Sequence, residues 1–160
     1  MDMGRAKMKE EEVIRHLREG RIKEWNEYFK WLSQLPYWES SSKFNLDGID
    51  LSDLDLHGVV LWNFSLVGTN LAAANLTKAS FHDVDLRDAN FSGACLRQAQ
   101  LGGEETNLSG ADFTNADLKD ILIGRKYDIS SVIGLTPETK RQIKLKMLVA
   151  VSPGPRRKKS

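Results

Sequence analysis

The sequence is poor in the features that mark several large classes of protein. Its 160 residues contain a single cysteine, which excludes an internal disulfide framework. No apolar run reaches the ~18 residues that a membrane span requires. The first residues, MDMGRAKMKEEE, also lack the apolar core of a signal peptide. These absences favour a cytoplasmic protein that does not contact a membrane.

The sequence also lacks the motifs of common catalytic and metal sites. It contains no phosphate-binding Gly-x-x-x-x-Gly-Lys loop, no Gly-x-Ser-x-Gly elbow and no Gly-Gly-x-Gly-x-Asp calcium repeat. Cys95 has no histidine near it in the sequence that could activate its thiol. His57 and His82 are too far apart in the chain to share a metal. We therefore expect a protein that is not an enzyme and that holds no cofactor or metal.

Proline is absent from residues 44–124, and this stretch repeats one five-residue pattern instead. The central position of each unit is Leu, Phe or Ile, and the residue two places earlier is usually Ala or another apolar residue. The pattern slips by two residues at Gly102-Gly103-Glu104-Glu105, which predicts a bulge at a corner. The central positions are Leu46, Leu51, Leu56, Leu61, Leu66, Leu71, Leu76, Phe81, Leu86, Phe91, Leu96, Leu101, Leu108, Phe113, Leu118 and Ile123.

A five-residue period fits neither a helix nor a plain strand, which repeat about every 3.6 and about every 2 residues. The two apolar positions of each unit alternate as in a strand, and its Asn, Asp or Gly residues favour a corner. Four corners close a coil of about twenty residues, so residues 44–124 predict about four stacked coils. The missing proline agrees with a stack that uses every backbone N–H. Bulky residues such as Phe44 and Ile121 are predicted to close the two ends.

The repeat resembles that of the pentapeptide-repeat family, whose consensus is Ala-(Asp/Asn)-Leu-x-x. Ala89-Asn90-Phe91, Ala111-Asp112-Phe113 and Ala116-Asp117-Leu118 match it closely. The resemblance implies an all-β solenoid core, a right-handed quadrilateral β-helix with the central residues inside.

Residues 8–33 predict helices, because apolar side chains recur at spacings of three and four. Gly20 interrupts this pattern, which favours two helices and a turn over one long helix. The segment that contains Trp25 and Asn26 resembles the Gly-x-x-x-x-Trp-Asn segment of bacterial members of the family. We expect residues 1–43 to form an α-helical N-terminal cap and linker over an edge that would otherwise recruit other chains. A partner-binding helical module is the alternative.

Residues 125–151 are expected to cap the other end. Thr136-Pro137-Glu138 has the residues of a helix start, so we predict a short C-terminal helix from Pro137 onward. Apolar residues alternate over 143–151, which leaves a strand open there; it could pair with the coil edge or with a second molecule in a homodimer. Residues 152–160, SPGPRRKKS, predict a disordered basic tail with at most weak nucleic-acid contacts.

Three outward positions break the polar pattern of the repeat. Val60, Trp62 and Val67 are apolar where the other units are usually polar, and exposed apolar patches often mark contacts. They are the candidate partner-binding residues of a protein-binding or scaffold protein. Cover of Trp62 by a terminal segment is the alternative.

Charge is divided unevenly along the chain. Residues 44–124 carry twelve acidic and four basic side chains, and residues 125–160 carry two acidic and ten basic ones. The resemblance extends to quinolone-resistance members of the family, whose action depends on an acidic rod. It implies an alternative function, a DNA-mimicking regulator of a type II topoisomerase (DNA gyrase).

Overall fold

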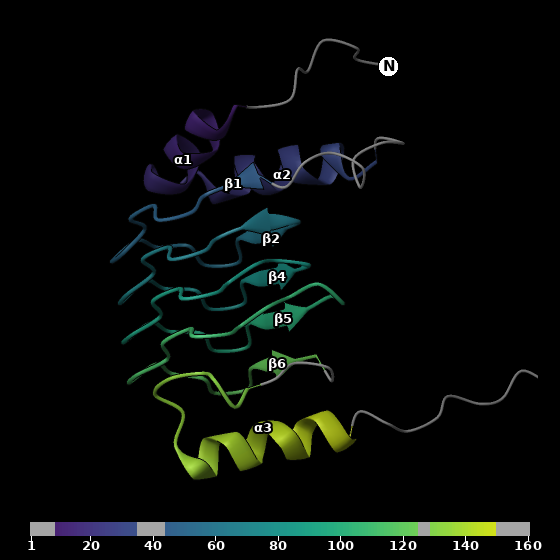
Figure 1. Cartoon of the computed structure of the whole chain (residues 1–160). Coiled ribbons are helices and arrows are strands. Elements are labelled where there is room, and N and C mark those ends of the chain that lie inside the picture. The colour runs from purple at the N-terminus through teal and green to yellow at the C-terminus, as the bar shows by residue number, and fades with distance from the viewer. Residues whose placement is uncertain (1–8, 35–43, 125–128, 150–160) are drawn as a thin grey trace, which may run out of the picture.

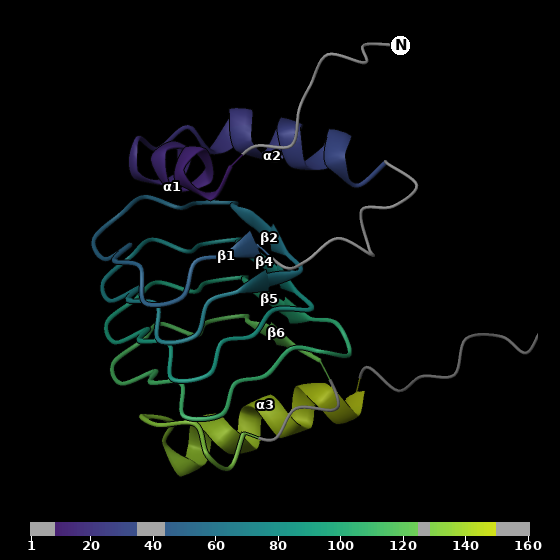
Figure 2. The same cartoon turned by 45° about the horizontal axis from the view of Figure 1, so that its top comes forward.

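The structure, a computed structural model, describes residues 9–34, 44–124 and 129–149. The predicted basic tail, residues 152–160, lies outside the described residues. The described chain forms a stack of flat coils between two helices at one end and one helix at the other (Figures 1 and 2).

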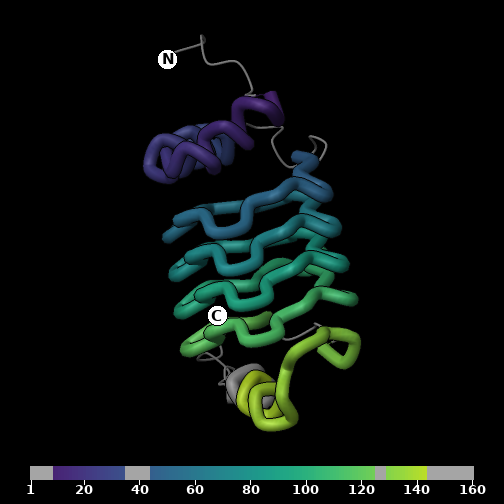
Figure 3. Tube along the Cα trace, turned by 90° about the vertical axis from the view of Figure 1, so that its left-hand side faces the viewer, coloured from purple at the N-terminus to yellow at the C-terminus, as the bar shows by residue number. Residues whose placement is uncertain are grey.

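Parallel pairing between successive coils builds the stack. Val60 pairs with Ser80 and Ser80 with Gln100, so each residue meets the one twenty positions later. The bridges Asp50–Asn70 and Asp55–Asn75 repeat this offset on two further sides of the coil. The strands are β1 (Phe44–Asn45), β2 (Val60–Trp62), β3 (Phe64–Ser65), β4 (Ser80–His82), β5 (Gln100–Gly102) and β6 (Leu122–Ile123). β1 pairs with β3, and β2, β4, β5 and β6 form a four-stranded sheet in that order. Figure 3 shows the coils as stacked layers.

The predicted slip appears as a change of register. Gln100 pairs with Leu122 and Asp85 with Asn107, so the offset grows to twenty-two residues between the third coil and the fourth. Pairing resumes on both sides of the insertion. The two extra residues therefore form a corner bulge, as predicted, and do not disturb the faces.

The central residues fill the inside of the coils. All of them from Leu46 to Phe113 are buried, whereas Leu118 and Ile123 are half-buried. Those two lie in the last coil, where no further coil covers them from below in the described chain. Residues at the corners of the coils adopt a positive backbone φ, as at Gly48 (66°) and Asp53 (57°). Gly, Asp and Asn tolerate this conformation best, which explains the composition of the repeat.

Two helices cover the first coil, as predicted. α1 (Glu10–Arg18) and α2 (Ile22–Leu32) are joined at Gly20, whose φ of 67° ends the first helix. Trp25 of α2 is fully buried, and its ring lies 6.4 Å from Phe44 and 5.8 Å from Phe64. Phe44 and Phe64 stack at 5.0 Å. The bulky residues of the first coils thus close the upper mouth of the solenoid against α2.

Trp25 and Asn26 also complete the hydrogen bonding of β2. The side-chain amide of Asn26 donates to the carbonyl of Gly58 at 2.8 Å and accepts the N–H of Val60 at 3.0 Å. The indole N–H of Trp25 donates to the carbonyl of Val60 at 2.7 Å. One coil below, the N–H of Ser80 donates to the preceding coil. Asn26 therefore replaces, at Val60, the partner that a preceding coil supplies elsewhere.

Side chains of α1 do the same on other sides of the first coil. The carboxylate of Glu10 accepts the N–H of Asn45 at 3.1 Å, and Arg18 donates to the carbonyl of Asp50 at 3.2 Å. Unpaired edge groups invite pairing with other chains. The two helices thus cover the interior of the first coil and also bond to backbone groups of Asn45, Asp50, Gly58 and Val60 at its edge.

A third helix lies under the last coil. α3 (Pro137–Val149) begins where predicted, with the Thr136 hydroxyl accepting the N–H of Thr139 at 3.1 Å. The alternative of a strand is wrong for residues 143–149, which are helical. Ile143 is buried with Ile121, Ile129 and Val132. Together these residues close the lower mouth.

Candidate functional site

Trp62 lies at the centre of the most irregular part of the surface. Its ring is 5.7 Å from that of Phe29 in α2 and 5.4 Å from the imidazole of His82 in the next coil. Its indole N–H donates to the hydroxyl of Ser80 at 3.1 Å. Trp62 is half-buried, because α2 covers part of the ring and leaves the rest at the surface. The contact with α2 agrees with the predicted cover of Trp62 by a terminal segment. The exposed part of the ring is the part that could contact a partner, so that role stays a prediction.

The two-residue insertion forms the other wall of this region. The backbone N–H of Glu105 donates to the carboxylate of Asp83 at 3.1 Å, and the Thr106 hydroxyl donates to the carbonyl of Gly102. Gly103 has a φ of 92°, and a Cβ at this position would lie 2.2 Å from the Asp83 carboxylate. The bulge therefore requires glycine, and it projects Glu104 and Glu105 outward beside His82 and Asp83.

Between these walls lies a hollow of about 540 Å³, which we call the Trp62 hollow. Its lining residues come from three successive coils at one corner: Trp62, Asn63, His82, Asp83, Gly103, Glu104 and Glu105. Three of them, Asp83, Glu104 and Glu105, are carboxylates. The Nε2 of His82 lies 3.3 Å from the Asp83 carboxylate. The hollow thus combines an aromatic wall with negative charge, which suits a cationic group.

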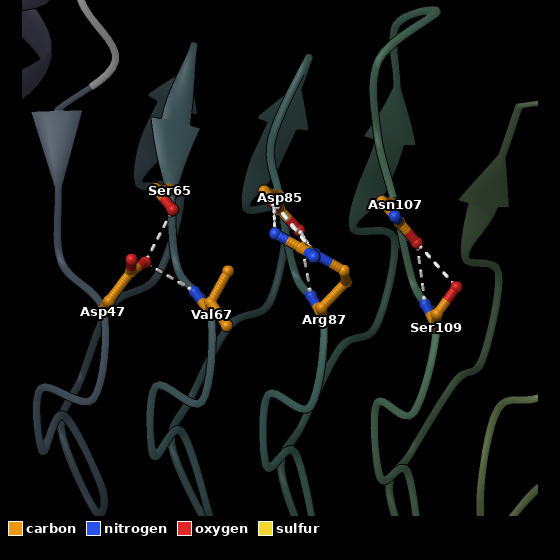
Figure 4. Close-up of polar contacts among 7 residues, drawn as sticks. All are labelled: Asp47, Ser65, Val67, Asp85, Arg87, Asn107 and Ser109. Atoms are coloured by element: carbon orange, nitrogen blue, oxygen red, sulfur yellow. Dashed lines mark hydrogen bonds and ion pairs between the residues drawn. The ribbon is translucent and has the colours of Figure 1, made fainter.

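Val60 and Val67 do not extend this site. Val60 is half-buried in the same strand as Trp62, but its backbone is engaged by α2. Val67 is half-buried on the next face of the coil, beyond the corner (Figure 4). There its N–H donates at 2.8 Å to the Asp47 carboxylate, which also accepts the Ser65 hydroxyl at 2.6 Å. The predicted patch is therefore split between two faces.

The face that carries Val67 is a row of local polar pairs (Figure 4). In the second coil below Asp47, the Arg87 guanidinium bonds to both carboxylate oxygens of Asp85, and these bonds raise the pKa of Arg87. In the coil after that, Ser109 donates to Asn107 at 2.8 Å. The polar groups drawn on this face are therefore hydrogen-bonded to one another.

Asparagine and aspartate side chains form ladders on two further faces. Asn70 donates to Asp50 at 2.9 Å, and Asn90 donates to Asn70 at 3.1 Å. Hydrogen bonds from Ser52, first through its hydroxyl, lower the pKa of Asp50. On the next face the backbone N–H of Lys119 and the Arg97 guanidinium lower the pKa of Asp117. These shifts favour the ionised carboxylates that the ladders use.

The remaining candidates for chemistry stay apart. Cys95 is half-buried, and its sulfur lies 3.3 Å from the Thr77 hydroxyl. His57 is exposed on the same side of the coil as Cys95, whereas His82 lies in the Trp62 hollow. Within residues 9–34, 44–124 and 129–149, no three His, Cys, Asp or Glu side chains group as metal ligands do. In the same part of the chain, none of the helices has the length and apolar character to cross a bilayer.

Comparisons with known proteins agree with the observed architecture. A family model described as pentapeptide repeats matches residues 65–103 and 104–120, in eight copies. A comparison with curated proteins found no match.

Several solved structures are similar to this chain. Rfr23, a pentapeptide repeat protein from the cyanobacterium Cyanothece 51142, is 25% identical over 60% of this chain and 67% of its own, with a TM-score of 0.39. The pentapeptide repeat protein alr5209 from Nostoc Pcc 7120 is 23% identical over 59% of this chain and 87% of its own, with a TM-score of 0.47. Full-length QnrB1, a plasmid-mediated fluoroquinolone resistance protein, is 26% identical over 49% of this chain and 39% of its own, with a TM-score of 0.42.

Proposed function

Because this chain is a pentapeptide-repeat protein, we propose that it is a non-catalytic scaffold that binds a partner protein at the Trp62 hollow. The pentapeptide-repeat fold is a right-handed quadrilateral β-helix, and its outer faces present side chains on a backbone held by its own ladders. A binding surface of this kind is ordered before the partner arrives. Less conformational entropy is then lost when the complex forms.

The observation that carries this proposal is the combination of groups in the hollow. The indole of Trp62 is the strongest aromatic partner for a cation, and Asp83, Glu104 and Glu105 lie beside it. A carboxylate binds a guanidinium with two parallel hydrogen bonds. The partner surface that fits this hollow therefore presents an arginine or lysine side chain.

The proposal is tested by affinity capture with four versions of the tagged chain. These are the wild type, Trp62→Ala, the double variant Glu104→Gln/Glu105→Gln, and the control Asp53→Asn/Asp88→Asn. The control removes two charges at other corners, where both aspartates have positive φ and asparagine is tolerated. We expect one set of proteins to be retained by the wild type and the control and lost from the other two versions. Equal recovery by all four versions would overturn the proposal.

The excess of acidic residues favours a second candidate, mimicry of DNA toward a type II topoisomerase such as DNA gyrase. Residues 44–124 hold twelve acidic and four basic side chains. Asp50 and Asp112 stand on one face, where small polar residues such as Ser52 and Ser92 accompany them. A gyrase supercoiling assay tests this function. Unchanged supercoiling at micromolar protein, with no complex on gel filtration, would rule it out.

The cytoplasmic location and the homodimer through a terminal segment remain predictions. Gel filtration of the purified chain at several concentrations tests the dimer. A partner recovered from a cytoplasmic extract would support the location.

A further inference from the structure

We propose that the last coil binds an extended peptide of another protein as a further parallel strand. The binding face is the one on which Asp55, Asn75, Cys95 and Asp117 follow one another from coil to coil. Its lower edge, residues 116–120, is called the open edge below. This site is separate from the Trp62 hollow and does not depend on the function proposed there.

The hydrogen bonds between the coils of this face stop at the open edge. In the coils above, each central residue donates its N–H to a carbonyl of the coil below, in the bonds Leu56 to Asn75, Leu76 to Cys95 and Leu96 to Asp117. Leu118 is next in this series, and no hydrogen bond joins its N–H to another residue within the described ranges. The carbonyl of Ala116 likewise has no donor there, whereas that of Ala94 accepts the N–H of Asp117 at 2.9 Å. Edge groups of this kind are a template for a further strand.

The neighbouring face shows how such an edge is filled. There the chain runs once more under the last coil, because the N–H of Phe113 donates to the carbonyl of Ile133 and the N–H of Ile133 donates to that of Ala111, both at 2.9 Å. Gly134 then leaves the stack with a φ of 78°, and α3 begins at Pro137 beneath the last coil (Figure 1). The open edge belongs to the next face, so a partner strand would continue a coil that the chain itself begins.

Space for a partner strand lies beside the open edge. A groove of about 610 Å³ has Ala116, Leu118 and Lys119 on one side and Thr139 and Gln142 of α3 on the other. Leu118 is half-buried, whereas the equivalent leucines of the coils above are fully buried. In strand addition, backbone hydrogen bonds supply affinity and pockets for side chains supply specificity. An apolar side chain of the partner would cover Leu118 as a further coil covers its equivalents.

The side chain of Asp117 favours an asparagine in the added strand. Asp117 corresponds to Asp55 in the first coil, whose Oδ1 accepts the N–H two residues later and also the side-chain amide of Asn75 at 2.8 Å. The Oδ1 of Asp117 accepts the equivalent N–H of Lys119 at 3.1 Å, while its Oδ2 accepts a bond from Arg97. A partner segment with asparagine below Asp117, followed by an apolar residue, therefore repeats the contacts of the coils above.

The sequence of this chain favours another protein as the source of that segment. No asparagine occurs in residues 1–8, 35–43, 125–128 or 150–160, which lie outside the described residues. All the asparagines of the sequence lie between Asn26 and Asn115, in α2 and in the coils, and a second copy holds them in its own fold. An extended segment with exposed asparagine thus comes from a different chain.

Nuclear magnetic resonance of the ¹⁵N-labelled full chain tests the proposal. The probe is the peptide AANLTKA, the sequence of residues 73–79, which pairs under the first coil in the structure. We expect a saturable shift of the Leu118 N–H signal and slower hydrogen exchange at this N–H. The same peptide methylated on the backbone nitrogen of its asparagine cannot donate to Ala116, so it should bind about three- to tenfold more weakly.

Three variants of the chain supply the controls. Gln142→Trp places a large ring in the groove and should weaken peptide binding by about tenfold or more. Arg141→Trp changes the next residue of α3, which is exposed and outside the groove, and should leave binding unchanged. Trp62→Ala should also leave it unchanged, which separates this test from partner capture at the Trp62 hollow. Circular dichroism checks that all three variants keep the fold.

Four results would overturn the proposal. Protection of the Leu118 N–H in the free chain at every concentration would show that a segment of the same molecule fills the open edge. Protection that rises with protein concentration would show that a second copy fills it. Equal binding of the methylated peptide would show that the peptide does not pair as a strand. The absence of a saturable shift at millimolar peptide would show that the edge binds no such segment.

Discussion

Replacement of Asn26 by alanine should destabilise the chain although Asn26 belongs to a helix and not to the coils. Its amide makes two part-buried hydrogen bonds to the backbone at the start of β2, one to Gly58 just before the strand at 2.8 Å and one to Val60 at 3.0 Å. Each such bond contributes about 1–1.5 kcal/mol net, so their loss costs about 2–3 kcal/mol. Alanine recovers about 0.6 kcal/mol through its higher helix propensity. The free energy of unfolding should therefore fall by about 1.5–2.5 kcal/mol.

Urea denaturation measures this change, and Glu27→Ala is the matched control. Glu27 is the next residue of α2 and is exposed, so its replacement alters the helix but not the edge of the first coil. Hydrogen exchange adds a local readout, because the N–H of Val60 should lose protection in Asn26→Ala but not in the control. A loss below about 0.5 kcal/mol for Asn26→Ala, with Val60 still protected, would refute the view that this side chain replaces a coil.

Three further perturbations follow from the site and the ladders. Gly103→Ala should lower the free energy of unfolding by about 2 kcal/mol or more, because the new Cβ would lie 2.2 Å from Asp83. Gly93→Ala should lower it by only about 1 kcal/mol, because Gly93 has a φ of 68° but open space around it. Thermal unfolding compares the two variants. Asp112→Asn should stabilise the chain by up to about 1 kcal/mol, because the new side-chain amide can donate to Asn90 and continue the ladder. Asp112→Ala should destabilise the chain, because it removes the acceptor of the Thr114 N–H. Urea midpoints that shift in the same direction for both variants would contradict this prediction. The lowered pKa values of Asp50 and Asp117 mean that their ionised forms stabilise the fold, a contribution present above their unfolded pKa and lost as the pH falls through the folded pKa. Asp50→Asn/Asp117→Asn should therefore lose less stability than the wild type between about pH 5 and about pH 2 in urea titrations, and equal losses would count against it.

The repeat could be predicted from the sequence because it depends on local chemistry. A corner residue and an apolar residue recur in each unit, so the twenty-residue coil and the bulge at Gly103 follow from counting. The break at Gly20 placed the turn between α1 and α2 for the same reason, since glycine adopts positive φ without strain. Each of these features is decided by a few neighbouring residues.

The contacts between the cap and the first coil depend instead on how two distant segments dock. Trp25 and Asn26 stood out as a sequence pair, but their bonds to Val60 join residues about thirty-five positions apart. Glu10 lies in the first turn of α1, where an acidic residue is common, yet it also accepts the N–H of Asn45. A polar residue beside a large aromatic one on a buried helix face was the available signal. Its partner could be identified only in three dimensions.

The Trp62 hollow shows how a regular solenoid acquires a specific site. In the unbroken repeat each outward side chain lies above its equivalent in the next coil, so the faces are flat. Between Trp62 and Glu105 two irregularities fall at the same corner: a large ring where the repeat is polar, and an insertion that carries two carboxylates. Neither alone makes a concave surface, because a ring on a flat face is only a patch and an insertion on a flat face is only a bulge. Their placement two coils apart, with His82 and Asp83 between them, creates the walls and floor of one hollow. Specificity in this fold therefore arises where departures from the repeat coincide at one corner.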